Sequence, residues 1–223
     1  MARKERRNRA GPKKVSSYHH GALRAALIRS AREILESEGY EALTLRAAAR
    51  RAGVSQAAPY NHFADKAALL AAIAALGFKE FAAAMRHEMS AAEDPHARLN
   101  ATGIAYVAFA TSNPGLFKLM FGSSVHQSSG DPDLDAARTS AYEVLRGAVH
   151  SAQSGSRDAE HDELESLRSW AFVHGLATMI NAGTIAPATY GARSARELTA
   201  ALFESPYTEK ESSARLAAKQ TRK

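Results

Sequence analysis

The chain has 223 residues, 45% of them hydrophobic, and it contains no cysteine. This length allows one or two domains with a buried core, and the missing cysteine excludes disulfides, thiolate catalysis and cysteine-based metal sites. The net charge of +6 is uneven, because residues 1–14 carry +6, residues 15–66 carry +2 and residues 67–208 carry −5. This division favours DNA over a membrane as the anionic partner. We see no run of about 18 apolar residues and expect no membrane-spanning helix.

The N-terminal segment is polar and basic over residues 1–17, and we predict a disordered arm that can lie along DNA phosphates or in a minor groove. Apolar residues from Leu23 to Leu35 recur at spacings of three and four, which predicts a helix after His20–Gly21. Gly39 is expected to end this helix, because a residue without Cβ accepts the positive φ of that position. This helix should pack across the next two and close a three-helix core.

Two short helices joined by a tight turn are predicted next. Thr44 can cap the first helix, and Gly53 supplies the turn. Ser55 is placed to cap the second helix, which we expect over residues 56–63. This layout is that of a helix-turn-helix, in which the second helix enters the major groove of DNA.

The residues of this stretch also form a specific pattern, carried by Thr44, Leu45, Arg46, Ala49, Ala52, Gly53, Val54, Ser55, Tyr60, His62, Phe63 and Lys66. Through them, residues 18–81 resemble the DNA-binding domain of the TetR family of bacterial transcriptional regulators. Pro59 departs from the pattern, since many members carry leucine there. Because proline has no N–H, it removes a hydrogen bond to the Ser55 carbonyl, which can distort the first turn of the second helix.

The resemblance and the side-chain chemistry together suggest contacts to double-stranded DNA. Gln56 and Asn61 are the best candidates to read bases, because amides pair bidentately with adenine. Ala57 and Pro59 can offer only apolar contact, for example to a thymine methyl group. Phosphate contacts are assigned to Thr44, Arg46, Tyr60, His62 and Lys66, with Arg46 also able to reach a base. Ser55 completes the set of expected DNA-binding residues.

The rest of the chain is predicted to be helical, with no convincing strand. The expected helix starts are Asp65, Asp94–Pro95, Asp131–Pro132, Ala159 and the capping box of Ser194 and Glu197. The apolar residues 116–121 are expected to form a further short helix or turn. We therefore predict an all-α fold of about nine helices. It comprises the three-helix DNA-binding domain at residues 18–81, a helical ligand-binding and dimerisation bundle at 82–205, and a disordered tail at 206–223.

The second half is unusually rich in aromatic and methionine side chains. Each of them alone is best interpreted as core, but together they can line a cavity for a small apolar or aromatic effector. The expected lining residues are Tyr106, Phe109, Phe117, Met120, Tyr142, Trp170 and His174.

A short motif lies among these residues. Trp170, Val173, His174 and Gly175 resemble the WHG motif of the C-terminal effector domain of one TetR subgroup, and this weaker likeness covers residues 95–205. Trp170 and His174 are four residues apart, so they lie on the same side of a helix. His174 can either hydrogen-bond a ligand or form a structural hydrogen bond inside the fold.

The resemblance further implies a homodimer formed through the last two long helices, at residues 159–182 and 194–204. Small side chains on these helices would allow tight contact with a second subunit; they are Ala171, Ala177, Ala182, Ala200 and Ala201.

Sequence signatures of catalysis are missing. The chain has no glycine-rich phosphate loop and no G-x-S-x-G nucleophile elbow. His161 stands among acidic residues, a pattern more typical of a solvated helix face than of a metal site. We therefore expect no catalytic residue, no metal and no cofactor.

These observations predict a cytoplasmic, ligand-responsive transcriptional repressor that binds a palindromic operator as a homodimer. The ligand would tilt the helix at residues 65–90 and change the separation of the two DNA readers. One alternative is a TetR-like architectural or division-control protein that binds DNA without a small-molecule inducer. Another is an all-helical enzyme that uses the aromatic cavity.

Overall fold

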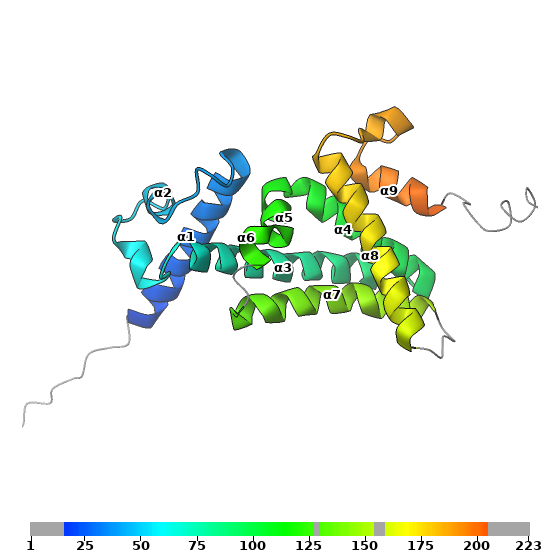
Figure 1. Ribbon diagram of the computed structural model, residues 1–223, viewed down its shortest axis with the longest axis horizontal. Helices are drawn as coiled ribbons and strands as arrows, with labels where there is room; N and C mark the ends of the chain where they lie inside the picture. The colour runs from blue at the N-terminus through cyan, green and yellow to red at the C-terminus, as the bar shows by residue number, and fades with distance from the viewer. Residues whose placement is uncertain (1–15, 127–129, 154–158, 205–223) are drawn as a thin grey trace, which may run out of the picture. The chain divides into compact units, whose positions relative to one another are not determined.

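The computed structural model describes residues 16–126, 130–153 and 159–204. Every regular element in these ranges is a helix, which confirms the all-α prediction (Figure 1). The chain divides into two compact units, Met1–Leu69 and Leu70–Lys223. The boundary between the two units falls inside the helix Lys66–Ser90.

The first unit contains α1 (Ser16–Ser37), α2 (Leu45–Arg51) and η1 (Ala58–Asn61). The start of α1 differs from the prediction, because the helix begins at Ser16 instead of after His20–Gly21. The rest of the predicted arm, and the predicted C-terminal tail, lie outside the described residues.

The α1 helix packs against α2 with one apolar face. Leu27, Ala31 and Ile34 on this face are at most 2% exposed. The helix is terminated by Gly39, whose φ is 87° and whose N–H donates to the carbonyl of Ile34 at 3.1 Å. The predicted glycine terminus is therefore confirmed, since positive φ favours a residue without Cβ.

The second helix of the motif is shorter and tighter than predicted. Residues 56–63 do not form an α-helix; η1 is a four-residue 3₁₀ helix, and its N-cap is Ala57 in place of the expected Ser55. The reason lies at Pro59, which has no N–H to donate to the Ser55 carbonyl. That carbonyl instead accepts from the Ala58 N–H at 3.0 Å, which is the three-residue spacing of a 3₁₀ turn.

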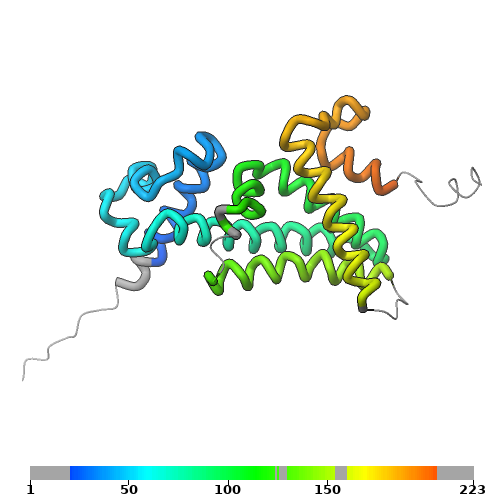
Figure 2. Tube along the Cα trace, in the orientation of Figure 1, coloured from blue at the N-terminus to red at the C-terminus, as the bar shows by residue number. Residues whose placement is uncertain are grey.

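The elements of the second unit are built around α4. They are α3 (Lys66–Ser90, which begins in the first unit), α4 (Pro95–Ser112), α5 (Pro114–Phe121), α6 (Ser123–His126), α7 (Pro132–Ala152), α8 (Ala159–Asn181), η2 (Pro187–Tyr190) and α9 (Ala195–Glu204). The α4 helix contacts α5, α7, α8 and α9. The trace passes from α4 into α5 at Asn113, which ends the first helix and begins the second (Figure 2). The α6 and η2 elements were not predicted.

The predicted helix starts are confirmed by their caps. The side chains of Asp65, Asp94 and Asp131 each accept a hydrogen bond from a backbone N–H three residues on, at 2.8–3.0 Å. The last cap differs in one detail. Ser194 Oγ accepts from the Glu197 N–H at 3.1 Å, but the Glu197 carboxylate accepts from the backbone N–H of Arg193, not from that of Ser194.

The α3 helix is more apolar than we expected from the sequence. It contains an 18-residue window that is long and apolar enough to cross a membrane. However, 61% of that window is buried inside the protein, as in the core helix of a soluble domain. We therefore interpret α3 as a core element.

Candidate nucleic-acid interface and effector cavity

Four of the five residues assigned to phosphate contacts, all except His62, line one open groove of the first unit. The groove is lined by Thr44, Leu45, Arg46, Tyr60, Ala64, Asp65 and Lys66. Thr44 is fixed there because its Oγ1 caps α2, accepting from the Ala47 N–H at 3.0 Å. Tyr60 is 53% exposed, a large fraction for an aromatic side chain. The groove therefore offers a hydroxyl, a guanidinium, a phenol and an ammonium group to a single partner surface.

Two side chains are candidates to read bases: Gln56 lies just before η1, and Asn61 is its last residue. Gln56 and Asn61 are both exposed, as are Ser55 and Ala57. Pro59 is buried. It offers no surface to a thymine methyl group in this conformation, and we remove it from the expected DNA contacts.

His62 and Lys66 are only half-buried, and both have contacts within the first unit. The His62 ring centroid lies 6.5 Å from that of Phe63. The Lys66 ammonium donates to the Tyr40 carbonyl at 3.2 Å and lies 4.2 Å from the centroid of the Tyr40 ring. An ammonium group has three donors, so Lys66 can keep the Tyr40 contact and still donate to a phosphate.

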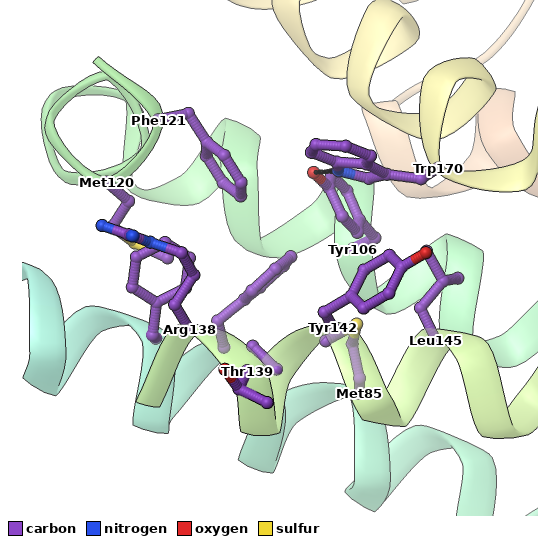
Figure 3. A pocket seen from close by; sticks show the side chains of 12 residues that line it. Met85, Tyr106, Met120, Phe121, Arg138, Thr139, Tyr142, Leu145 and Trp170 are labelled. Carbon is purple, nitrogen blue, oxygen red and sulfur yellow. Dashed lines mark hydrogen bonds between the residues drawn. The ribbon is translucent and has the colours of Figure 1, made fainter. Parts of the chain in front are cut away.

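The second unit contains a partly open apolar cavity of about 350 Å³ (Figure 3). It is lined by Phe78, Phe81, Met85, Tyr106, Met120, Phe121, Arg138, Thr139, Ala141, Tyr142, Leu145 and Trp170. Among the predicted residues, this set contains Tyr106, Met120, Tyr142 and Trp170. The other three predicted residues, Phe109, Phe117 and His174, do not line the cavity.

Two groups of lining residues were missed from the sequence. Phe78, Phe81 and Met85 come from α3, which the sequence analysis did not assign to the cavity. Arg138 is the charged member of the lining, and it lies one helical turn before Tyr142 on α7. That spacing of four was the available signal, because it places both side chains on one face.

A chain of hydrogen bonds links the aromatic wall to His174. Trp170 Nε1 donates to Tyr106 Oη at 3.0 Å, and Tyr106 Oη lies 2.9 Å from His174 Nδ1. An indole can only donate, so the phenol accepts from Trp170. His174 forms a structural hydrogen bond inside the fold at Nδ1, and the phenol donates to this atom when it is unprotonated.

Burial supports this protonation state. It lowers the pKa of His174 below its usual value, which favours the neutral imidazole. It also raises the pKa of the Tyr106 phenol, which therefore stays protonated and able to donate. We interpret the Trp170 and His174 positions of the motif as an internal support for Tyr106.

Large apolar side chains are exposed along α8 and α9. Leu164, Leu167, Phe172, Met179 and Leu202 are each 41–59% exposed. A Cβ added at Gly175 would meet no atom of this chain within 4 Å, so the helix surface there is open. Ala177 is fully buried in its own chain and is removed from the small residues expected at a dimer contact.

Within the described ranges, no three histidine, aspartate or glutamate side chains gather as the ligands of a metal ion would. Two acidic neighbours of His161 have partners on α7. Asp162 lies 2.8 Å from the Nδ1 atom of His150, and Glu163 accepts from the Tyr142 hydroxyl at 2.9 Å.

Comparisons with known proteins cover both units. A family model described as bacterial regulatory proteins of the tetR family matches residues 27–73, and one described as a tetracyclin repressor-like C-terminal domain matches residues 99–204. The class C tetracycline repressor protein of Escherichia coli is 53% identical over 51 residues, only 23% of either chain.

Solved structures extend the likeness to most of the chain. A protein of unknown function from Rhodococcus sp. RHA1 is 33% identical, with a TM-score of 0.70, over 85% of this chain and 95% of that one. The TetR family regulator PfmR from Thermus thermophilus shares the fold, with 22% identity and a TM-score of 0.58 over 80% of this chain and 91% of its own. The matched family consists of regulators and not of enzymes. The chain belongs to the TetR family and is a DNA-binding transcriptional regulator.

Proposed function

We propose that this protein is a ligand-responsive repressor that acts in the cytoplasm and binds a palindromic operator as a homodimer. The observation that carries the proposal is the apolar cavity of the second unit. A concave, mostly apolar space of this volume is typical of small-molecule binding sites. The alternative of an architectural protein without an inducer is therefore disfavoured.

The α3 helix is the element through which a ligand would act on DNA binding. It supplies Lys66 to the groove and Phe78, Phe81 and Met85 to the cavity. A ligand changes DNA affinity only if it binds more tightly to the protein in its DNA-free state. We propose that the ligand shifts α3 and so changes the separation of the two DNA readers in the dimer.

The groove and η1 would divide the contacts to each half-site. Thr44, Arg46, Tyr60 and Lys66 would bind phosphates and fix the position of the protein on the duplex. Gln56 and Asn61 would read base edges in the major groove. In a dimer, the two half-sites would lie about 34–36 Å apart on one face of the duplex.

The exposed apolar side chains of α8 and α9 support the homodimer. An apolar face of this kind on a soluble protein is commonly an interaction surface. A two-fold axis would place α8 and α9 of one subunit against the same helices of its partner, so that one patch covers the other.

A band-shift experiment tests the DNA assignment. The operator would first be identified by genomic footprinting of the protein. The double variant Tyr60→Ala, Lys66→Ala should bind that duplex at least about tenfold more weakly, because two charge-assisted or phosphate-directed contacts are lost.

The matched control is Tyr190→Ala, Lys79→Ala. Both of its side chains are exposed, and neither lines the groove. The control should bind as the unchanged protein does. Normal operator binding by the Tyr60 and Lys66 variant would refute the assignment.

A further inference from the structure

We propose that the cavity takes an apolar acid, a small molecule with an aromatic or aliphatic body and one carboxylate, and that Arg138 binds this carboxylate. The proposal rests on the proposed function in that it treats the cavity as the effector site. It specifies the chemical class of the effector, which neither the fold nor the comparisons indicate.

The other polar groups of the aromatic wall already have partners. Tyr106 and Trp170 are hydrogen-bonded to each other, and Tyr106 is also bonded to His174. The Tyr142 hydroxyl donates to the Glu163 carboxylate at 2.9 Å. These groups are therefore not available to anchor a ligand without giving up a bond inside the protein.

Arg138 differs from them. Its Nη1 atom pairs with Asp135 Oδ1 at 3.3 Å, while its Nε and Nη2 atoms are shielded from solvent and have no hydrogen-bond partner among the described residues. The guanidinium carbon lies 6.0 Å from the centroid of the Phe78 ring. Figure 3 shows the Arg138 side chain among the residues that line the cavity. The unpaired edge of this cation is therefore covered, and it belongs to a side chain that lines an apolar space.

The geometry of this edge selects the ligand group. Nε and Nη2 carry two parallel N–H groups on one side of the guanidinium, which match the two oxygens of a carboxylate. Shielded donors without partners are unfavourable, and a carboxylate would satisfy both of them. A neutral amide offers one carbonyl acceptor and no charge. A dianion is disfavoured because Asp135 is close and Arg138 is the one cationic side chain of the lining.

The size and surface of the cavity define the rest of the molecule. A volume of about 350 Å³ is at the small end of ligand pockets, which span about 300–1,000 Å³. Phenylalanine, methionine and leucine side chains make up much of the remaining lining. A compact aromatic or medium-chain acid fits this description.

Paired probes that differ only in the acid group test the proposal. We would measure the binding of 4-phenylbutyric acid against 4-phenylbutanamide, and of octanoic acid against octanamide, to the full chain at pH 7.5. Trp170 is the single tryptophan and lines the cavity, so its fluorescence reports occupancy. At least one acid should bind about 10- to 100-fold more tightly than its amide, as expected for a charge-assisted, bidentate pair.

Variants of α7 assign this preference to one side chain. Arg138→Met should reduce the acid-to-amide ratio to about one and leave amide binding nearly unchanged. Arg146→Met is the matched control, because Arg146 lies on the same helix, pairs with Glu143 and does not line the cavity. It should keep the full preference. Arg138→Lys keeps the charge but loses the parallel donors, and should retain only part of the preference.

The outcomes separate this proposal from the proposed function. Equal binding of acid and amide for both pairs, no binding of either acid at about 10 mM, or an undiminished preference in both Arg138 variants would overturn the proposal. Operator release is measured separately by band shift with the same acids. Acid-selective binding without release would leave the ligand assignment in place and contradict the ligand-responsive repressor.

Discussion

The two candidate sites of this protein are built in opposite ways. The DNA groove is an open surface whose lining residues come from one stretch, between Thr44 and Lys66. The effector cavity is partly enclosed, and its side chains come from α3, α4, α5, α7 and α8. We infer that the groove depends on local turns and caps, whereas the cavity depends on how five helices pack. Changes that disturb packing should therefore affect the two sites differently.

The largest expected contrast is between one aromatic ring from each site. Phe81 is 2% exposed, and its ring centroid lies 4.7 Å from that of Tyr106, so Phe81→Ala should lower the free energy of unfolding by about 3–5 kcal/mol. Tyr60→Ala removes an exposed ring and should change that free energy by less than about 0.5 kcal/mol while weakening DNA binding. Urea unfolding and band shifts would measure both effects. Equal destabilisation by the two changes would contradict the contrast.

A smaller effect is expected inside the cavity wall. Tyr106→Phe leaves the Trp170 N–H and the His174 Nδ1 atom without their shared partner, and should destabilise the protein by about 1–3 kcal/mol. Tyr142→Phe is the matched control, since its hydroxyl pairs with Glu163 at the surface, and the expected change is below about 0.5 kcal/mol. Thermal unfolding of both variants provides the measurement. A Tyr106→Phe protein as stable as the control would mean that the hydrogen-bond chain contributes little.

The smallest expected effect is a pH dependence that belongs to the second unit. Burial lowers the pKa of His174 in the folded state below its usual value of 6.5, so the unfolded chain binds this proton more readily. The contribution of His174 to stability is therefore complete above pH 6.5 and declines as the pH falls below it. His174→Asn keeps an acceptor near the Nδ1 position and removes the titration.

The free energy of unfolding of the His174→Asn variant should therefore fall less between pH 7 and pH 5 than that of the unchanged protein. Unfolding in urea at several pH values measures this difference. Parallel pH profiles for the two proteins would show that His174 does not titrate in this range.

Local signals in the sequence were sufficient for most helix boundaries. The Asp–Pro starts of α4 and α7 act through one cap and one restricted φ, and both appear where the sequence placed them. The same reasoning was wrong for residues 56–63, because Pro59 changed the hydrogen-bond spacing of a helix too short to absorb the loss.

The cavity was harder to predict because its members are distant in sequence. An aromatic residue of α4 or α5 has the same local pattern whether it faces a void or a neighbouring ring. Phe117 contacts the Tyr106 and His174 rings, and Phe109 the Phe81 ring, instead of lining the space. Arg138 was overlooked because only the packed structure separates its bonded Nη1 atom from its unbonded edge.

The shortness of η1 limits how many bases of an operator this regulator can contact directly. A helix with three residues per turn superimposes Ala58 on Asn61, and with Pro59 buried it turns few side chains outward. We expect the sequence specificity of this protein to depend on direct contacts to very few base pairs per half-site. Sequence-dependent bending and groove width of the DNA would contribute much of the remaining specificity. Operators for this protein would then tolerate many base substitutions, but they would not tolerate changes in the spacing of the half-sites or in the flexibility of the duplex.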